Sequence, residues 1–369
     1  MLSIRSGEWI INYVESFPRE LMIELTTSCN YNCIYCFRNA ILDSEIGRYM
    51  DVEVFKNLVK QAYNAKISKI SLSGWGEPLT HPAIIDFISE LKKYKFNIIL
   101  NTNGSLISEY AEELCKLGVD IIHVSIDSVY EELYQQTRVG GNLSKINEGL
   151  TKIKELKIKN DSLKPEIHVQ FTLTTLNMED LLNLPEYMKR IAASQVTISN
   201  IIPLNREMEE KLAIYRNKGY MEKMEDIRDK LARKAFESGG KIILPNFTNI
   251  SDRKCPFIHV NAAFIRYDGE VTPCLQYAHN WKTNFMGVTR TIRKIVFGNI
   301  LKEELMKIWR KPEYIRFRLN TFFFKMPSCY ECRLKDYCNL TLTNEYDCWG
   351  NQPSCASCPY SHGIVSCPL

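Results

Sequence analysis

The residues whose spacing most directly indicates chemistry are the cysteines, of which the 369-residue chain has 13. Cys29, Cys33 and Cys36 fall in the run CNYNCIYCFRN, with the spacing C-x3-C-x2-C. Three thiolates in one short loop can ligate three corners of a 4Fe-4S cube, which leaves one iron open to another ligand. A zinc site, the alternative, usually takes paired C-x2-C units and four protein ligands. We therefore predict a metal centre with these three cysteines as its ligands and as catalytic residues.

A second set of cysteines begins at residue 255, and only Cys115 lies between the two sets. Cys115 falls on the apolar face of a predicted helix, so we interpret it as a core residue. A long chain without a signal peptide favours metal ligation over a disulfide scaffold. Eight thiolates could hold two more 4Fe-4S clusters, which leaves one of the nine spare or exchanged, and two zinc knuckles are the alternative. The predicted ligands are Cys255, Cys274, Cys329, Cys332, Cys338, Cys348, Cys355, Cys358 and Cys367.

The composition is that of an ordinary globular protein, with 45% hydrophobic and 24% charged residues. A formal net charge of +4 provides no strong field for nucleic acid or an anionic membrane. No apolar run of about 18 residues and no signal-peptide core occur, so we expect a cytoplasmic protein without a membrane or nucleic-acid partner. The six histidines show no ligand-like spacing and are expected to be structural: His81, His123, His168, His259, His279 and His362.

Short β-branched runs alternate with helical stretches from residue 21, which is typical of repeated βα units around a parallel sheet. A charged helical stretch over 205–238, interrupted at Gly219, separates these units from the cysteine-rich part. There, two β-prone runs flank Asp268-Gly269, a two-residue hairpin signal, and this hairpin would deliver Cys274. The predicted strands cover 21–26, 68–73, 96–101, 120–126, 167–174 and 195–202.

Polar motifs follow several of these strands. SGWGEP at 73–78 follows the second strand, NTNG at 101–104 ends the third, and VSIDS at 124–128 ends the fourth. Ligands bind at the carboxyl ends of the strands in barrels of parallel strands, so we expect these motifs to gather around one site. Turn formation and helix capping are the alternative roles for each motif.

The cysteine spacing, with Tyr35 directly before the third cysteine, resembles the cluster loop of the radical S-adenosylmethionine (SAM) enzymes. The resemblance implies that the open iron binds the amino and carboxylate groups of SAM, which is cleaved reductively to a 5′-deoxyadenosyl radical. SGWGEP resembles the Gly-Gly-Glu-Pro motif of that family, with Trp75 in place of a glycine and Glu77 set to accept a hydrogen bond from the methionine amino group.

Other SAM contacts follow from the same resemblance. Ser125 and Asp127 would contact the ribose, Arg138 would meet the carboxylate, and Ser199 and Asn200 would line the adenine pocket. The full set of expected SAM-binding residues outside the adenine pocket is Tyr35, Gly74, Gly76, Glu77, Asn103, Ser125, Asp127 and Arg138.

The run Gly269-x4-Cys274, followed by C-x2-C-x5-C at 329–338, resembles the SPASM extension, which carries two auxiliary 4Fe-4S clusters. The usual fourth cysteine comes four positions after the third, whereas here the next is Cys348, so the assignment of cysteines to clusters stays open. The resemblance implies SAM and three 4Fe-4S clusters. We predict an α/β fold, a partial (β/α)6 TIM-type barrel at 20–204, preceded by a segment at 1–19 and followed by a helical connector at 205–249 and a small iron-sulfur domain at 250–369.

GWGEPLTHP and the tail DCWGNQPSCASCPYSHGIVSCP most resemble the subgroup associated with maturing tungsten-containing aldehyde ferredoxin oxidoreductases. This implies a protein, peptide or pterin-cofactor substrate and an external electron donor such as ferredoxin or flavodoxin. Modification of a ribosomally made peptide is the alternative, although the twenty residues before the first predicted strand are too few for a leader-binding module. An iron-sulfur electron-transfer protein and a zinc-stabilised binding module are two further alternatives, and neither accounts for the polar residues at the strand ends.

Overall fold

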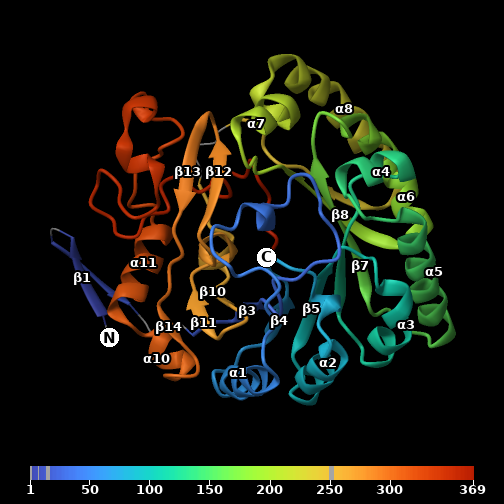
Figure 1. The fold of residues 1–369 in the computed structure, drawn as a ribbon, viewed down its shortest axis with the longest axis horizontal. Coiled ribbons are helices and arrows are strands. Elements are labelled where there is room, and N and C mark those ends of the chain that lie inside the picture. Colours follow the sequence, from blue (N-terminus) through green and yellow to red (C-terminus); the bar gives the residue numbers. More distant parts are fainter. Residues whose placement is uncertain (1, 7, 14–16, 249–252) are drawn as a thin grey trace.

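A computed structural model describes residues 2–6, 8–13, 17–248 and 253–369 (Figure 1). Its centre is a sheet in which the six predicted strands pair in parallel and in chain order. Successive residues alternate between the two faces, and the outward-facing residues of these strands are buried under helices. The strands are β3 (Glu20–Ile23), β4 (Lys69–Leu72), β5 (Asn97–Thr102), β6 (Ile121–Ser125), β7 (Glu166–Leu173) and β8 (Ala193–Asn200).

Amphipathic helices cover the outer face of this sheet (Figure 1). Ile107, Ala111 and Leu114 of the third helix are fully buried, because this apolar face packs on the sheet as a helical period requires. Gly118 follows that helix with φ +67°, the left-handed conformation expected of a helix C-cap. The helices are α1 (Val52–Asn64), α2 (Ile84–Lys93), α3 (Ile107–Lys116), α4 (Glu131–Thr137), α5 (Leu143–Lys159) and α6 (Leu184–Ile191), with 3-10 turns η1 (Phe37–Ala40), η2 (Pro78–Thr80) and η3 (Met178–Asn183).

The sheet does not end at the sixth strand. β9 (Lys241–Ile243) pairs with β8, and β10 (Ala262–Ile265) pairs in parallel with β3 at the other edge. β11 (Glu270–Thr272) and β14 (Gly298–Asn299) continue the sheet beyond β10. The chain between β10 and β11 bends over four residues, 266–269, rather than over the two that the sequence predicted. The cysteine-rich part therefore shares hydrogen bonds with the barrel sheet.

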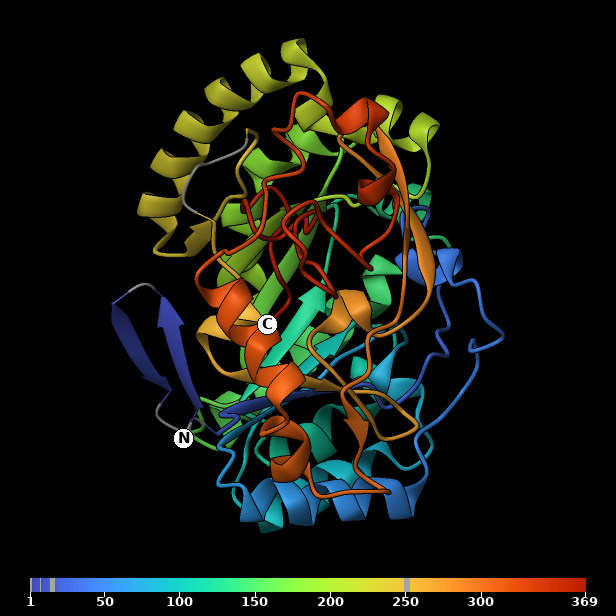
Figure 2. The same cartoon turned by 90° about the vertical axis from the view of Figure 1, so that its left-hand side faces the viewer.

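The segment between barrel and cysteine-rich part is mainly helical, with α7 (Arg206–Leu212), η4 (Ile214–Arg216) and α8 (Lys218–Ser238). Asn217 caps α8, so the interruption predicted at Gly219 lies just before that residue, and Gly239 ends the helix with φ +72°. None of the helices in the described ranges is long and apolar enough to cross a membrane. Figure 2 shows the hairpin of β1 (Leu2–Ser6) and β2 (Trp9–Tyr13) standing beside the sheet.

The cysteine-rich part has short elements joined by loops. They are α9 (Pro256–His259), η5 (Leu275–Tyr277), the hairpin β12 (Trp281–Phe285) and β13 (Val288–Ile292), α10 (Leu305–Trp309), α11 (Pro312–Phe322), η6 (Lys335–Tyr337) and η7 (Asn339–Leu342). After them the tail returns to the barrel, and Figure 1 places the C-terminus near the middle of the molecule. The Ser366 N–H donates to Ser199 Oγ at 3.0 Å and its hydroxyl donates to Ile198 O at 2.9 Å.

Candidate active site

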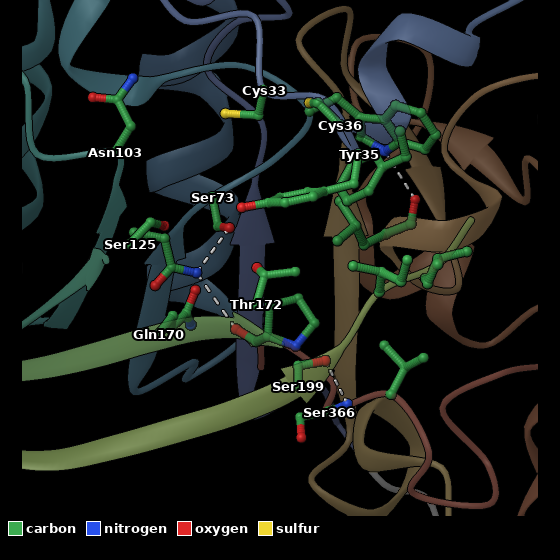
Figure 3. A pocket seen from close by; sticks show the side chains of 18 of the residues that line it. Cys33, Tyr35, Cys36, Ser73, Asn103, Ser125, Gln170, Thr172, Ser199 and Ser366 are labelled. Atoms are coloured by element: carbon green, nitrogen blue, oxygen red, sulfur yellow. Dashed lines mark hydrogen bonds between the residues drawn. The ribbon is translucent and has the colours of Figure 1, made fainter. Parts of the chain in front are cut away.

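A cavity of about 270 Å³ opens at the carboxyl ends of the parallel strands. Its walls come from the cysteine loop after β3, the loops after β4 and β5, the strands β6 to β8, and the C-terminal tail. Figure 3 shows Cys33 and Asn103 towards one end of this cavity and Ser199 and Ser366 towards the other. The barrel thus places the sequence-predicted cysteine loop over a polar-walled space.

Cys29, Cys33 and Cys36 all line this cavity. Two polar side chains point at the sulfurs: Asn103 Nδ2 lies 3.7 Å from Cys29 Sγ, and Arg138 Nη1 lies 3.9 Å from Cys33 Sγ. Burial raises the pKa of Cys33 to about 12, so its thiolate form needs a strongly cationic partner, such as a metal ion, to stabilise it. Three thiols on one cavity wall fit a metal cluster held by three protein ligands.

The loop after β4 lies against the cysteine loop through its two glycines. A Cβ at Gly76 would lie 2.3 Å from Ser28 O, and one at Gly74 would lie 2.8 Å from Glu24 Cβ. These glycines therefore permit the close approach of one loop to the other, and both also line the cavity. Trp75, the departure from the Gly-Gly-Glu-Pro motif, is buried, and its indole N–H donates to Leu275 O at 3.1 Å, so it joins the barrel to the cysteine-rich part.

Glu77 is buried in the cavity wall and its carboxylate is held by three donors. Leu79 N and Thr102 Oγ1 donate to Oε1 at 3.0 and 2.7 Å, and Asn103 N donates to Oε2 at 2.6 Å. Burial raises the pKa of Glu77 to about 7, although these hydrogen bonds act to lower it. A cationic amino group bound beside the carboxylate would favour its ionised form, which suits the expected contact with the methionine end of SAM.

Asp127 is placed differently from the expected ribose contact. It is fully buried, and it is absent from the lining of the cavity. Its Oδ2 accepts hydrogen bonds from the Tyr35 hydroxyl and, at 2.5 Å, from Arg138 Nε, while Oδ1 accepts from Thr172 N at 2.6 Å. Asp127 therefore fixes two cavity-wall side chains, Tyr35 and Arg138, rather than facing the cavity itself.

The other expected SAM-binding residues are brought together. Those that line the cavity are Tyr35, Gly74, Gly76, Glu77, Asn103, Ser125, Arg138, Ser199 and Asn200. The sequence analysis missed Asn101, Gln170, Thr172, Thr197 and the tail residues Val365, Ser366 and Pro368. Polar residues at every second position of β7 and β8 were a signal for an inward-facing polar wall, whereas no periodic pattern marks the tail.

Two of the histidines expected to be structural are neighbours. His123 and His168 face each other on β6 and β7, with 3.2 Å between His123 Nε2 and His168 Nδ1. Because they are 45 residues apart, only the pairing of the strands brings them together.

The nine C-terminal cysteines fall into two groups with one residue left over. An outer set, Cys329, Cys332, Cys338 and Cys348, lines a small cavity of about 40 Å³. An inner set consists of Cys255, Cys274, Cys355 and Cys358. Burial raises the pKa of Cys274 far above its ordinary value, and the charges of the other three cysteines of this set raise it further. Each set has the four thiols that one 4Fe-4S cluster requires. Among the described side chains, no three His, Cys, Asp or Glu residues are grouped tightly enough for a single metal ion.

Cys367 is the ninth thiol, and it lines the active-site cavity rather than the outer set's cavity. Burial raises the pKa of Cys367, and the nearby Cys255 and Cys358 raise it further. This thiol therefore lies between the inner set and the active-site cavity.

We predict that the two sets lose iron independently. The double variant Cys332→Ala and Cys348→Ala, in the outer set, should hold roughly four irons per chain fewer than the wild type. The separate double variant Cys274→Ala and Cys355→Ala, in the inner set, should also hold roughly four fewer. Cys367→Ala should leave the iron content unchanged. Iron and sulfide assays after anaerobic reconstitution measure these values, and loss of four irons from the Cys367 variant would contradict the assignment.

Comparisons with known proteins identify the two parts of the chain to which these cysteines belong. The family model described as the radical SAM superfamily matches residues 23–191, and an iron-sulfur cluster-binding domain, SPASM, matches residues 255–333. Two solved structures share the fold. Streptococcus suis SuiB bound to S-adenosylmethionine has a TM-score of 0.63 and 17% sequence identity, and the match covers 88% of this chain and 73% of that chain. The structure of native anSMEcpe with bound AdoMet has a TM-score of 0.61 and 18% sequence identity, and the match covers 89% of this chain and 92% of that chain.

Two curated relatives match well beyond the radical SAM domain. The tungsten-containing aldehyde ferredoxin oxidoreductase cofactor-modifying protein of Pyrococcus furiosus is 32% identical over 352 residues, which cover 95% of this chain and 97% of that protein. A probable GTP 3′,8-cyclase of Methanocaldococcus jannaschii is 29% identical over 70% of this chain and 85% of its own length. This protein belongs to the radical SAM superfamily and is an enzyme of that family with a C-terminal SPASM domain.

Proposed function

We propose that this radical SAM enzyme matures a tungsten-containing oxidoreductase by modifying its cofactor. The observation that carries the proposal is the similarity to the Pyrococcus furiosus cofactor-modifying protein, which covers nearly all of both chains. That similarity spans 352 residues, so it extends well beyond the radical SAM domain that the family model matches at 23–191. A relative that shares both parts of the chain favours a shared class of substrate.

Bound SAM and its cluster would supply a 5′-deoxyadenosyl radical, and the chain would supply their positioning. We propose that Cys29, Cys33 and Cys36 hold the cluster, and that Glu77, fixed by three donors, receives the SAM amino group. Asp127 keeps the Arg138 guanidinium in place for the carboxylate through a buried ion pair at 2.5 Å. The proposal includes three 4Fe-4S clusters in total, with reduction by a ferredoxin or a flavodoxin.

Co-expression with a tungsten-dependent aldehyde oxidoreductase tests this function. We expect high oxidoreductase activity and a mass change in its extracted cofactor when the wild-type protein is present. The variant with Cys29, Cys33 and Cys36 replaced by alanine is the control and should give neither. Equal activity and identical cofactor mass with both proteins would eliminate the proposed function.

Modification of a ribosomally made peptide is the competing function. The fold is shared with a structure described as SuiB bound to its precursor peptide SuiA, but at 17% identity this similarity shows the fold alone. A mass change on a small peptide encoded nearby, with no effect on the oxidoreductase, would favour this alternative.

A further inference from the structure

Arg290, on β13, is a buried cation whose side chain is held by neutral groups alone. The residue is 1% exposed. Its Nε donates to Thr341 O at 2.8 Å, and its Nη1 donates to Phe285 O at 2.9 Å and to Val288 O at 3.3 Å. The remaining nitrogen, Nη2, is buried and has no hydrogen-bond partner among the described residues. The guanidinium therefore has carbonyl acceptors but no anion among its hydrogen-bond partners.

A buried guanidinium without a counter-charge is costly, because arginine cannot relieve the cost by losing its proton. Arg138 and Arg266, which are also buried, are each paired with carboxylates. Arg290 departs from this rule. Its surroundings indicate that an anion other than a carboxylate of the described chain lies near it.

Glu209, a buried carboxylate of α7, is the counter-charge that the chain itself could offer, because it binds the same hairpin. Its Oε2 accepts from Asn284 Nδ2 at 2.6 Å and from Gly287 N at 2.9 Å. Its Oε1 lies 3.8 Å from Arg216 Nε. Glu209 is thus bound to other groups, and no ion pair joins it to Arg290.

Arg290 lies behind the wall of the small cavity that the outer cysteine set lines. Thr341, whose carbonyl accepts from Arg290 Nε, is part of that wall, and its hydroxyl donates to Cys338 O at 3.0 Å. The Arg290 guanidinium carbon lies 5.2 Å from the centre of the Tyr330 ring, and Tyr330 directly follows Cys329. Figure 1 shows β13 beside the last part of the chain, and β13 contacts η7 there. Two ligands of the outer set are therefore next to groups that contact Arg290.

An anionic cluster in the outer set would supply the missing charge. Burial raises the pKa of Cys329, whereas a hydrogen bond with Ser357 and the charge of Arg290 oppose that rise, so Arg290 favours the thiolate that binds metal. Four thiolates around a 4Fe-4S core carry a net negative charge, which grows by one on reduction. Cys332 and Cys348 are exposed, so such a cluster would have water on one side and the buried guanidinium on the other.

We propose that Arg290 is the counter-charge of the cluster bound by the outer set and that it raises the reduction potential of that cluster. A fixed cation stabilises the reduced cluster, which has one more negative charge, more than the oxidised cluster. Arg290 acts through its charge and does not bind iron. The inference rests on the proposed cluster content and does not depend on the substrate.

A redox titration of the reconstituted protein, followed by electron paramagnetic resonance, tests the proposal. The signal of the outer cluster is the one that the double variant Cys332→Ala and Cys348→Ala lacks. At a fixed potential, Arg290→Met should lower the ratio of reduced to oxidised outer cluster about tenfold, which is a fall of about 59 mV in midpoint for a one-electron couple. The midpoints of the other clusters should stay as in the wild type.

Two further variants separate charge from packing. Arg290→Lys keeps the positive charge but not the planar group that binds three carbonyls, so it should keep a midpoint close to that of the wild type. Arg293→Met is the matched control, because Arg293 is an exposed arginine whose backbone binds Asn344 in the wall of the same cavity. Water and salt screen an exposed charge, so this control should leave the midpoint unchanged.

Equal midpoints of the outer cluster in the wild type and in Arg290→Met would overturn the proposal. The same fall in Arg290→Lys as in Arg290→Met would also overturn it, because the cause would then be lost contacts rather than lost charge. If Arg290→Met assembles no outer cluster, the lysine variant decides. A cluster with the wild-type midpoint in that variant supports the counter-charge, and a missing cluster shows that Arg290 only supports the loop.

An iron assay and the co-expression experiment keep this inference apart from the proposed function. If the wild-type outer set holds no iron, the proposed cluster content fails, and the inference fails with it. If the cluster is present but Arg290→Met leaves its midpoint unchanged, the inference alone fails. Maturation of the oxidoreductase by the wild type is measured separately, so its absence would contradict the proposed function whatever the titration shows.

Discussion

Replacing Cys29, Cys33 and Cys36 together by alanine is expected to abolish SAM cleavage and to remove about a third of the bound iron. The three thiols line one cavity, and they are separated from the outer and inner cysteine sets of the SPASM part. The auxiliary sets should therefore keep their iron. Chromatography of 5′-deoxyadenosine after reduction with dithionite, together with an iron assay, measures both effects.

Cys115→Ala is the matched control, because Cys115 packs on the outer face of the barrel and is not part of the cavity lining. It should retain both iron and SAM cleavage. The prediction fails if the triple variant still produces 5′-deoxyadenosine, or if it loses all of its iron. The second outcome would show that the auxiliary sets cannot hold iron when the first cluster is absent.

The six barrel strands could be predicted because β-branched runs alternate with amphipathic helices at regular spacing. The cysteine loop could be placed because it directly follows a strand. The burial of the Asp127 carboxylate could not be predicted, because the chain leaves β6 at Ser125 and the alternation of a strand no longer applies. This carboxylate pairs with Tyr35, which lies 92 residues earlier in the chain, and with Arg138, which directly follows α4.

Long-range pairing accounts for the other differences. β10 joins β3 across about 240 residues of chain, and no local pattern indicates that a hairpin beyond a helical connector will extend the barrel sheet. The tail reaches the cavity through hydrogen bonds from Ser366 to β8, which depend on the assembled barrel. The division of nine cysteines into two sets and Cys367 likewise depends on tertiary placement, since Cys355 and Cys358 join Cys255 and Cys274 rather than their sequence neighbour Cys348.

A buried charge network joins the barrel to the SPASM part. His279 lies between two carboxylates, with Nε2 3.0 Å from Glu24 Oε1 and Nδ1 2.6 Å from Glu45 Oε2. Arg266 pairs with Glu45 at 2.7 Å and with Asp268 at 2.9 Å. The side chains of Glu24, His279 and Arg266 are fully buried, so each charge depends on its partners rather than on water.

We expect Arg266→Met to destabilise the protein by about 3 kcal/mol, because it removes a fully buried guanidinium from its ion pairs with the partly exposed carboxylates of Glu45, Asp268 and Glu270. Thermal unfolding of the reconstituted protein under anaerobic conditions should show a clear fall in the midpoint. Lys56→Met, which breaks an exposed pair with Glu53, is the control and should leave the midpoint unchanged. A midpoint for Arg266→Met equal to that of the control would show that the network contributes little.

The same network predicts how stability changes with pH. Burial lowers the pKa of His279, but Glu24 and Glu45 outweigh it and raise the pKa above its ordinary value near 6.5. Its contribution is therefore complete below pH 6.5 and is lost as the pH rises through the raised value. Burial opposes ionisation of Glu45, but His279 and Arg266 lower its pKa, so its contribution is present above pH 4.5 and is lost as the pH falls through the lowered value.

The wild type should therefore gain most from this network between about pH 4.5 and 6.5, and should lose part of that gain towards alkaline pH. His279→Gln keeps hydrogen-bonding capacity but cannot carry the charge, so it should lower the unfolding midpoint most at pH 5.5 and least at the alkaline end. The midpoints of both proteins at pH 5.5, 7 and 8.5 measure this convergence. Parallel profiles across that range would contradict a stabilising contribution from the protonated His279.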